Sequence, residues 1–296
     1  MRLLFICMIL ICASDILAQD SLTVTESGKK FSKGMSSGFS VKIPFARLKD
    51  VKSDWKKYLH QKGKINPKEN DGEIVLPQTL VSEISSDSVL LYSIINANPD
   101  VVELTVFAGK NDSVFYSTSS EPKLADGLQT FIRNFAVNEY KNAMNDQLTV
   151  EQKKLKILDQ NLSDLENDND RYEKKIKSNE RIIDKTVDEI KTNKDLQELK
   201  SSTILQQQKV LATYLTPSDQ KSDEMKKLKA LEKEKKKLEK EEESLHKDID
   251  DKKDDIKVLK RQIDLNNSEK TPAKKKEIEK QKEVIAGVEI KLKNIK

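Results

Sequence analysis

The chain has 296 residues, with 54 Lys and Arg against 50 Asp and Glu, a net charge of +4, and 5% aromatic residues. These averages conceal two halves that meet near residue 148, because all eight Phe, the single Trp and seven of the eight Gly precede that point. The second half consists almost entirely of Lys, Glu, Asp, Leu, Ile, Asn and Gln. This division excludes a single large globular enzyme and predicts a small globular domain followed by charged helices.

Residues 1–19 have the layout of a secretory signal peptide: a basic residue, Arg2, an apolar run from Leu3 to Ala13, and then small and polar residues. The apolar run is about half as long as the roughly 20 residues that cross a bilayer. We therefore expect cleavage of this segment, export to the periplasm or the extracellular space, and no transmembrane segment in the mature chain. Both cysteines, Cys7 and Cys12, lie in the segment, so the mature chain should contain no disulfide and no cysteine metal ligand.

Residues 20–148 predict a small α+β domain, with 16 basic and 16 acidic residues and enough chain for one hydrophobic core. Alternating apolar and polar residues over 38–43 predict a half-buried strand. Apolar spacings of three and four then predict an amphipathic helix from Leu48 to Leu59, with Trp55 facing the core and not a ligand.

Several β-rich segments follow this helix, and the gaps between them are too short for helical crossovers. We expect them to pair as an antiparallel meander over 74–81, 89–95, 101–107 and 114–117. Pro77 favours a bent edge strand for the first of these. A second helix is expected after Glu121-Pro122, so that two helices cover one face of a four- or five-stranded sheet.

Residues 149–296 predict a long all-α coiled-coil array, in which 37 basic and 33 acidic residues leave an apolar stripe intact. Apolar residues recur at the first and fourth heptad positions from Leu155 onwards, although Asn and other polar residues dilute the second half of this seam. An unbroken helix is expected from Val150 to Leu215.

An internal repeat is predicted within this array, because sliding the chain along itself aligns Lys153–Leu158 with Lys226–Leu231 and keeps later apolar positions in register. The first copy would cover 149–215 and the second 216–296; similarity arising only from shared composition is the alternative. Pro217 cannot continue a helix interior and Ser218 can cap the next helix. We therefore expect the chain to reverse there, so that the two copies form an antiparallel hairpin.

Several short patterns resemble catalytic or binding motifs. Gly34–Gly38 matches the Gly-x-Ser-x-Gly pattern of a nucleophilic serine, but it precedes the first expected strand and the chain has only two histidines, His60 and His246. A flexible Gly/Ser loop is the favoured interpretation. Glu243–His246 matches the Glu-x-x-His motif of di-iron bundles, which requires a second such motif that the helices do not contain.

The basic runs at 235–237 and 274–276 could contact phosphates, but acidic residues lie close to the first and no aromatic residues are interleaved for base stacking. A solvated helix face is the favoured interpretation, and no nucleic-acid partner is expected. The chain contains no glycine-rich phosphate-binding loop. The sequence therefore predicts no catalytic, cofactor-binding or metal-binding residues.

The segments Phe131–Val137, Ser244–Ile249 and Gln281–Ile285, together with the Lys-Lys-Leu-Lys segments, resemble a group of uncharacterised exported proteins of Bacteroidota. In that group a small N-terminal domain precedes Lys/Glu-rich coiled coil. The resemblance implies the same compartment and architecture for this chain, and no particular activity.

These features predict a non-enzymatic structural or protein-interaction protein of the cell envelope, with the small domain as a docking head and the coiled coil as a spacer or binding surface. Its partner would be another protein, or a second copy bound through the coiled coil. A holdase-like periplasmic chaperone is the alternative, since a β-containing body with basic helical arms resembles trimeric periplasmic chaperones in outline.

Overall fold

The computed structural model describes residues 22–296, so the predicted signal peptide lies outside the described residues. The chain divides into two compact units. The first, here called the head unit, comprises residues 22–155 together with 280–296, and the second, the hairpin unit, comprises 156–279. The sequence-based division placed all of 216–296 in one helical repeat, whereas the segment 280–296 groups with the head.

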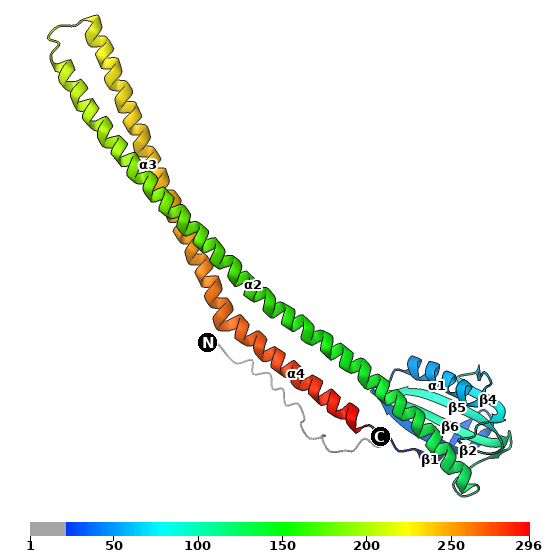
Figure 1. Cartoon of the computed structure of the whole chain (residues 1–296). Helices are drawn as coiled ribbons and strands as arrows, with labels where there is room; N and C mark the ends of the chain where they lie inside the picture. Colours follow the sequence, from blue (N-terminus) through cyan, green and yellow to red (C-terminus); the bar gives the residue numbers. More distant parts are fainter. Residues whose placement is uncertain (1–21) are drawn as a thin grey trace, which may run out of the picture. The chain divides into compact units, whose positions relative to one another are not determined.

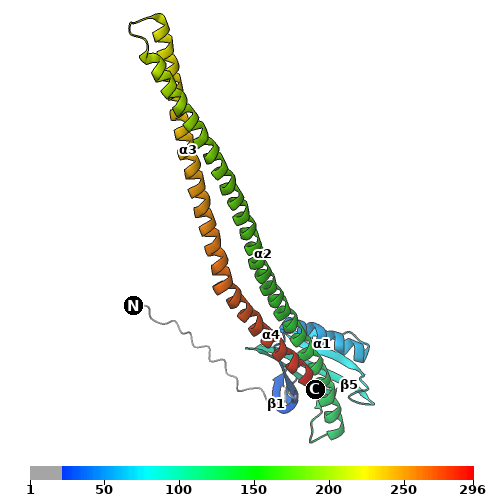
Figure 2. The same ribbon diagram turned by 60° about the vertical axis from the view of Figure 1, so that its left-hand side comes forward.

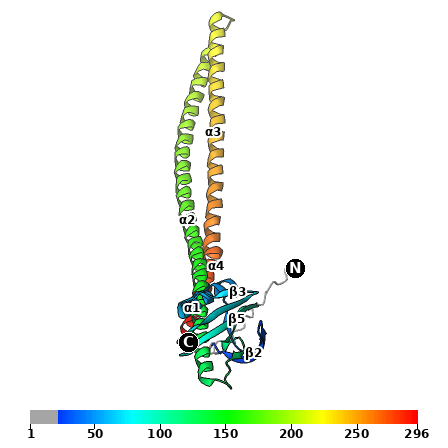
Figure 3. The same cartoon turned by 90° about the vertical axis from the view of Figure 1, so that its right-hand side faces the viewer.

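The head unit is built on one antiparallel sheet (Figure 3). Its seven strands have the order β1-β2-β6-β5-β4-β3, with β7 paired to β6. The meander expected over β4 to β7 is confirmed. The register of β4 against β5 shifts between Leu76 and Thr79, around Pro77. Strand β3 pairs only with residues 73–75 of β4, so the part of β4 that contains Pro77 lies at the edge of the sheet, as expected. The strands are β1 (Thr25–Phe31), β2 (Gly34–Pro44), β3 (Lys68–Asn70), β4 (Glu73–Leu80), β5 (Ser88–Asn98), β6 (Val101–Asn111) and β7 (Val114–Phe115).

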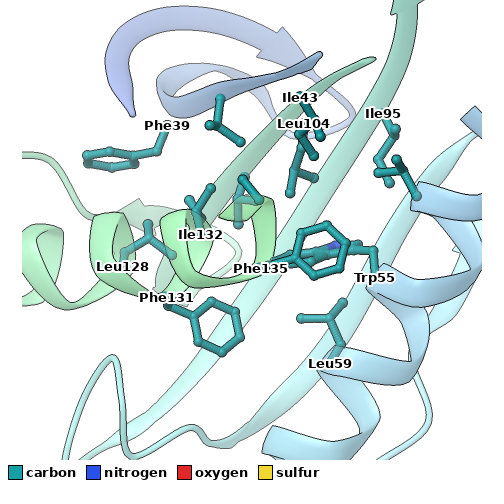
Figure 4. Packing of buried hydrophobic residues seen from close by; sticks show 14 of the residues in the cluster. Phe39, Ile43, Trp55, Leu59, Ile95, Leu104, Leu128, Phe131, Ile132 and Phe135 are labelled. Atoms are coloured by element: carbon teal, nitrogen blue, oxygen red, sulfur yellow. The ribbon is translucent and has the colours of Figure 1, made fainter. Parts of the chain in front are cut away.

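Two helices supply the apolar layer that packs on the sheet, as expected for an α+β domain. Helix α1 (Leu48–Gly63) buries Val51, Trp55 and Leu59, and the beginning of α2 (Pro122–Ala212) buries a second apolar stripe. Figure 4 shows these side chains meeting residues of β2, β5 and β6. The residues at this contact include Phe39, Ile43, Ile95, Leu104, Leu128, Phe131, Ile132 and Phe135.

The Gly/Ser pentad at 34–38 is not the flexible loop that the sequence favoured. It forms the first half of β2 and pairs residue by residue with β1, from Ser27↔Gly38 to Phe31↔Gly34. Gly38 lies where an added Cβ would come within 2.9 Å of the Phe107 ring, so the small residue makes room for an aromatic side chain. Pairing with β1 satisfies backbone groups that a loop would expose to water.

Helix α2 runs without a break from Pro122 to Ala212, so the boundary predicted at residue 148 falls inside one continuous helix (Figure 1). The chain then reverses into α3 (Asp219–Leu265), the π-helix η1 (Asn266–Lys270) and α4 (Thr271–Asn294). Ser218 caps α3 as predicted, because its hydroxyl oxygen accepts a hydrogen bond from the backbone N–H of Lys221 at 3.2 Å.

The hairpin unit confirms the predicted antiparallel pairing of α2 with α3 (Figure 2). Three contacts at increasing distance from the turn establish the direction: Gln207 with Glu224, Lys200 with Glu234 at 2.6 Å, and Gln197 with Glu242 at 2.7 Å. Farther along, the amide of Asn169 donates to Asn267 at 2.8 Å. Residue numbers fall along α2 as they rise along α3, so the two helices are antiparallel.

The π-helix inserts one residue into the heptad pattern. Ile249 and Asn266 are both buried, and their separation fits a heptad seam, in which buried positions follow each other at spacings of three and four residues in turn. Ile278 is the next fully buried seam residue, and it follows Asn266 at an interval one residue longer than the heptad requires. A π-turn absorbs one extra residue. It also lies immediately before Pro272, whose missing N–H removes a helical hydrogen bond.

One polar network occurs twice in the chain. In the hairpin unit, Gln207 donates to the backbone and side chain of Glu224, and Glu224 pairs with Lys227 at 2.7 Å. In the head unit the equivalent contacts are made by Gln281, Glu151 and Lys154.

The spacing of these two networks agrees with the predicted repeat. The two glutamates, and likewise the two lysines, are separated by the same interval that aligns Lys153–Leu158 with Lys226–Leu231. The glutamines are separated by one residue more, which matches the π-helix insertion. An internal duplication would give this spacing, and the duplication stays a prediction.

The end of α4 belongs to the head core, which the sequence did not predict. Val288 and Ile295 are 5% and 4% exposed, and both lie in the same apolar cluster as Trp55. Leu292 is partly buried against this cluster. The C-terminal residues of the chain therefore complete the core that the N-terminal sheet begins.

Spin labels at Lys191 and Lys240 provide a solution test of the hairpin. The contact between Gln197 and Glu242 places these two positions on neighbouring parts of α2 and α3. We expect a short distance from pulsed electron paramagnetic resonance, whereas a single straight helix would separate them by about 74 Å at 1.5 Å per residue. A dominant long distance within one chain would contradict the hairpin.

Candidate functional site

The residues of the motifs noted in the sequence do not converge. Ser36 lies in β2 opposite Lys29, and His60 is exposed in the last turn of α1. The histidine of the Glu-x-x-His segment, His246, contacts Glu242 and not the motif residue Glu243, with 3.6 Å between His246 Nε2 and Glu242 Oε1. Among residues 22–296, no group of three or more His, Cys, Asp and Glu side chains is arranged to hold a metal ion.

The candidate site is instead a groove of about 680 Å³ on the head unit. Its walls are the first half of α1, a stretch of α2, the loop between β2 and α1, and the turn between β5 and β6. This size is typical of grooves that accept small molecules or a few side chains of a partner. The polar and charged residues that line it are Arg47, Asp50, Ser53, Asp54, Lys57, Asn98, Asp100, Glu139, Asn142, Asp146 and Gln147.

The groove carries five carboxyl groups against two basic side chains, and both basic groups already have partners. Arg47 pairs with Asp50 and reaches Asp146 at 3.4 Å. Lys57 pairs with Asp54 at 2.7 Å. The groove is therefore acidic, and its two basic side chains pair with Asp50, Asp54 and Asp146 but not with Asp100 or Glu139.

Of the two groove carboxyl groups without an ion pair within residues 22–296, Asp100 is exposed and Glu139 is buried. The Glu139 side chain projects from the buried face of α2 and the residue is 6% exposed. Among the described residues its one hydrogen-bond donor is the Asn142 amide, at 3.4 Å. Burial, reinforced by the negative charge of Asp54, raises the pKa of Glu139 to about 7. At neutral pH the head unit thus holds a carboxyl group poised between its two protonation states.

Phe45 forms part of the rim and has an unusual backbone conformation. Its φ angle is +59°, a region that bulky side chains rarely occupy, and its N–H donates to the carbonyl of Asp100 at 3.1 Å. The ring is half exposed and packs parallel to Tyr140, with Lys291 from α4 at 5.7 Å from its centroid. A strained, exposed aromatic residue at the rim of a groove is typical of a binding surface.

The sequence contains one signal for this site, a charged residue among the apolar positions of a helix. Glu139 follows Ile132 by seven residues and Phe135 by four, so it stands on the apolar stripe of its helix. A charged residue on such a stripe is rarely buried without a partner. The other walls of the groove come from α1 and two loops, and only the tertiary structure brings them to this helix.

Glu139→Gln is expected to stabilise the protein at pH 8. Because the carboxyl pKa is higher in the folded state than its ordinary value of 4.5, the folded state binds the proton more tightly, and stability falls as pH rises from about 4.5 to about 7. The neutral amide removes this loss, worth about 2–3 kcal/mol at pH 8. Urea denaturation at pH 5 and pH 8 tests this, with the exposed Glu121→Gln as control. An equal pH slope in wild type and Glu139→Gln would contradict the assignment.

Comparisons of this chain with protein-family models, curated proteins and solved structures found no match. The resemblance to exported Bacteroidota proteins therefore remains a prediction, and the function has to be argued from the groove and the hairpin. No helix within residues 22–296 has a stretch long and apolar enough to cross a membrane.

Proposed function

We propose that the protein is a non-enzymatic interaction protein of the cell envelope, whose head unit docks a protein partner and whose helical hairpin serves as a spacer or second binding surface. The groove beside Glu139 is the observation that carries this proposal. It combines a volume suited to partner side chains, a half-exposed aromatic rim and a buried carboxyl group that makes no ion pair among the described residues. Such a combination is more typical of a binding site than of a packed domain surface.

The hairpin supports the spacer role, because its apolar seam is closed within the chain. Polar residues at the seam make specific cross-helix bonds, for example Gln197 to Glu242 and Asn266 to Asn169 at 2.8 Å. Buried polar pairs of this kind fix the register of a helical pair. What remains outside is a mixed-charge surface of low net charge, which suits contact with a folded protein better than capture of polyanions.

The holdase alternative is favoured by a different observation, the apolar residues around the hairpin turn. Residues 201–218 contain a single charged residue, Lys209, in an otherwise highly charged region. The side chains exposed near the turn include Leu199, Leu205, Val210, Leu215 and Met225. Exposed apolar side chains of this kind can bind unfolded chains.

Site-specific photo-crosslinking in the native host separates the two functions. A photoreactive residue in place of Gln147 reports on the groove, and one in place of Leu205 reports on the hairpin turn. A docking head should yield one crosslinked folded protein from the groove position. A holdase should yield many envelope proteins from the turn position and should suppress the aggregation of an unfolded porin, and that outcome would replace the docking proposal.

Export is part of the same proposal and is tested separately. Removal of the N-terminal segment before about Ser21 is expected, as for secretory signal peptides generally. Intact-mass measurement of protein purified from the native host decides this. Recovery of the full 33.8 kDa chain from the cytoplasm would contradict export.

A further inference from the structure

We propose that the groove on the head unit binds a basic side chain of the partner, a lysine ammonium or an arginine guanidinium, with Glu139 as its counter-ion. This inference deepens the proposed function and rests on it, since it names the chemistry of the docking contact. It stands on the geometry of the groove, on the burial of Glu139 and on the pairing of the surrounding charges.

The charged residues of the groove favour a positively charged ligand. The charged groups that face it are Asp50, Asp54 and Lys57 from α1, Arg47 from the preceding loop, Asp100 from the β5–β6 turn, and Glu139 and Asp146 from α2. With all of them ionised, three negative charges are in excess. An anionic ligand would add repulsion, and a neutral ligand would leave a buried carboxylate without a charged partner.

The Glu139 carboxylate can accept further hydrogen bonds from a ligand. The residue is more than nine-tenths buried, yet it is one of the residues that line the groove, and its carboxyl group accepts a single long hydrogen bond from Asn142. A carboxylate has about four lone-pair sites for hydrogen-bond donors, so most of its capacity remains open to an incoming ligand. An ammonium or guanidinium group would supply charge-assisted hydrogen bonds at this position.

The groove also offers apolar surface to the aliphatic stem of such a ligand. Leu48, Ala143 and Val150 contribute apolar surface to the groove, and the half-exposed ring of Phe45 lies at its rim. A lysine or arginine side chain presents a flexible apolar stem and a charged head, which matches this order of surfaces. Lys291 already lies over the Phe45 ring, 5.7 Å from its centroid, so the ligand's charged head is assigned to Glu139 and only its stem to the apolar residues.

The consequence is a binding site whose affinity depends on the ionisation of one residue. At pH 8 Glu139 is mostly ionised and should attract the cation, whereas at pH 5.5 it is mostly protonated and should not. A cationic ligand favours the ionised form, so binding near neutral pH should release a proton from the groove.

The test uses the full chain and three capped pentapeptides of alanine that carry a central lysine, arginine or glutamine. Binding is followed by NMR through the side-chain carboxyl resonances of the protein. We expect the lysine and arginine peptides to shift the Glu139 signal and to bind about tenfold more weakly at pH 5.5 than at pH 8. The glutamine peptide should not bind measurably. The relative strength of the lysine and arginine peptides identifies which basic group the groove prefers.

Variants make the assignment specific. Glu139→Gln should weaken binding of the basic peptides about tenfold at pH 8 and should remove the pH dependence. The exposed Glu121→Gln keeps the groove intact and should bind as the wild type does. Equal binding of the glutamine peptide, unchanged binding by Glu139→Gln, or no binding of any peptide at millimolar concentration would each overturn the inference. If the groove crosslink to one folded partner persists in that case, the docking function stands and only its cationic chemistry fails.

Discussion

Replacing Trp55 with alanine is expected to lower the free energy of unfolding of the head unit by about 3–5 kcal/mol, as for other fully buried aromatic residues. Trp55 is the largest fully buried side chain of the described residues. Its ring contacts Phe135 edge-on at a centroid distance of 4.7 Å, and Phe131 and Tyr58 at 5.8 and 5.7 Å. Truncation therefore removes both the buried area and the centre of an aromatic cluster that joins α1 to α2.

Trp55→Phe is the matched control for this change. The indole Nε1 of Trp55 is buried without a hydrogen-bond partner among the described residues, so phenylalanine removes an unsatisfied donor while keeping most of the ring. Its cost should stay below about 1.5 kcal/mol, as for other conservative changes of core shape. Hydrogen exchange of the β5 and β6 amides reports on the head unit alone. Equal protection in Trp55→Ala and wild type would show that this residue is not central to the core.

Val288→Asp is expected to detach the end of α4 from the head core. Val288 is 5% exposed and packs in the same cluster as Trp55, so an aspartate there would be an unpaired charge among apolar side chains. Such a change costs about 3 kcal/mol or more when the side chain stays buried. Because detachment of the segment avoids this cost, residues 280–296 should become sensitive to proteolysis and the head unit should melt at a lower temperature.

Ile290→Asp supplies the control, since Ile290 lies two residues away on the same helix and is 56% exposed. It introduces the same charge and the same loss of helix propensity, and it should leave proteolysis of the segment unchanged. Similar sensitivity in both variants would show that helix weakening, and not lost packing, is responsible.

An isolated fragment of residues 20–148 extends this comparison. The sequence predicts that this fragment folds alone, because its apolar pattern is self-contained and its basic and acidic residues are equal in number. A cooperative melting transition would agree with this prediction. The packing of Val288 and Ile295 adds the expectation that the fragment melts at a lower temperature than the full chain. A non-cooperative fragment would mean that the end of α4 is required for the core.

Local pattern was sufficient wherever an element's own residues decide its conformation. The period of apolar residues identified α1 and placed Trp55 on its buried face. Alternation and short gaps identified β4 to β7 and their antiparallel pairing. Pro217 and Ser218 identified the reversal between α2 and α3. In each case a short-range steric or hydrogen-bonding rule acts between residues close together in the chain.

The tertiary structure decided the features in which distant segments determine each other. Strand β1 and the pentad at 34–38 have no strong strand pattern, and they become strands because each supplies the other's hydrogen-bond partners. The end of α4 resembles the rest of the charged array in composition, yet it completes the head core through Val288 and Ile295. The groove arises in the same way, because α1, α2 and two loops converge around Glu139. Composition and periodicity describe one segment at a time, and burial of a particular carboxyl group depends on which other segments cover it.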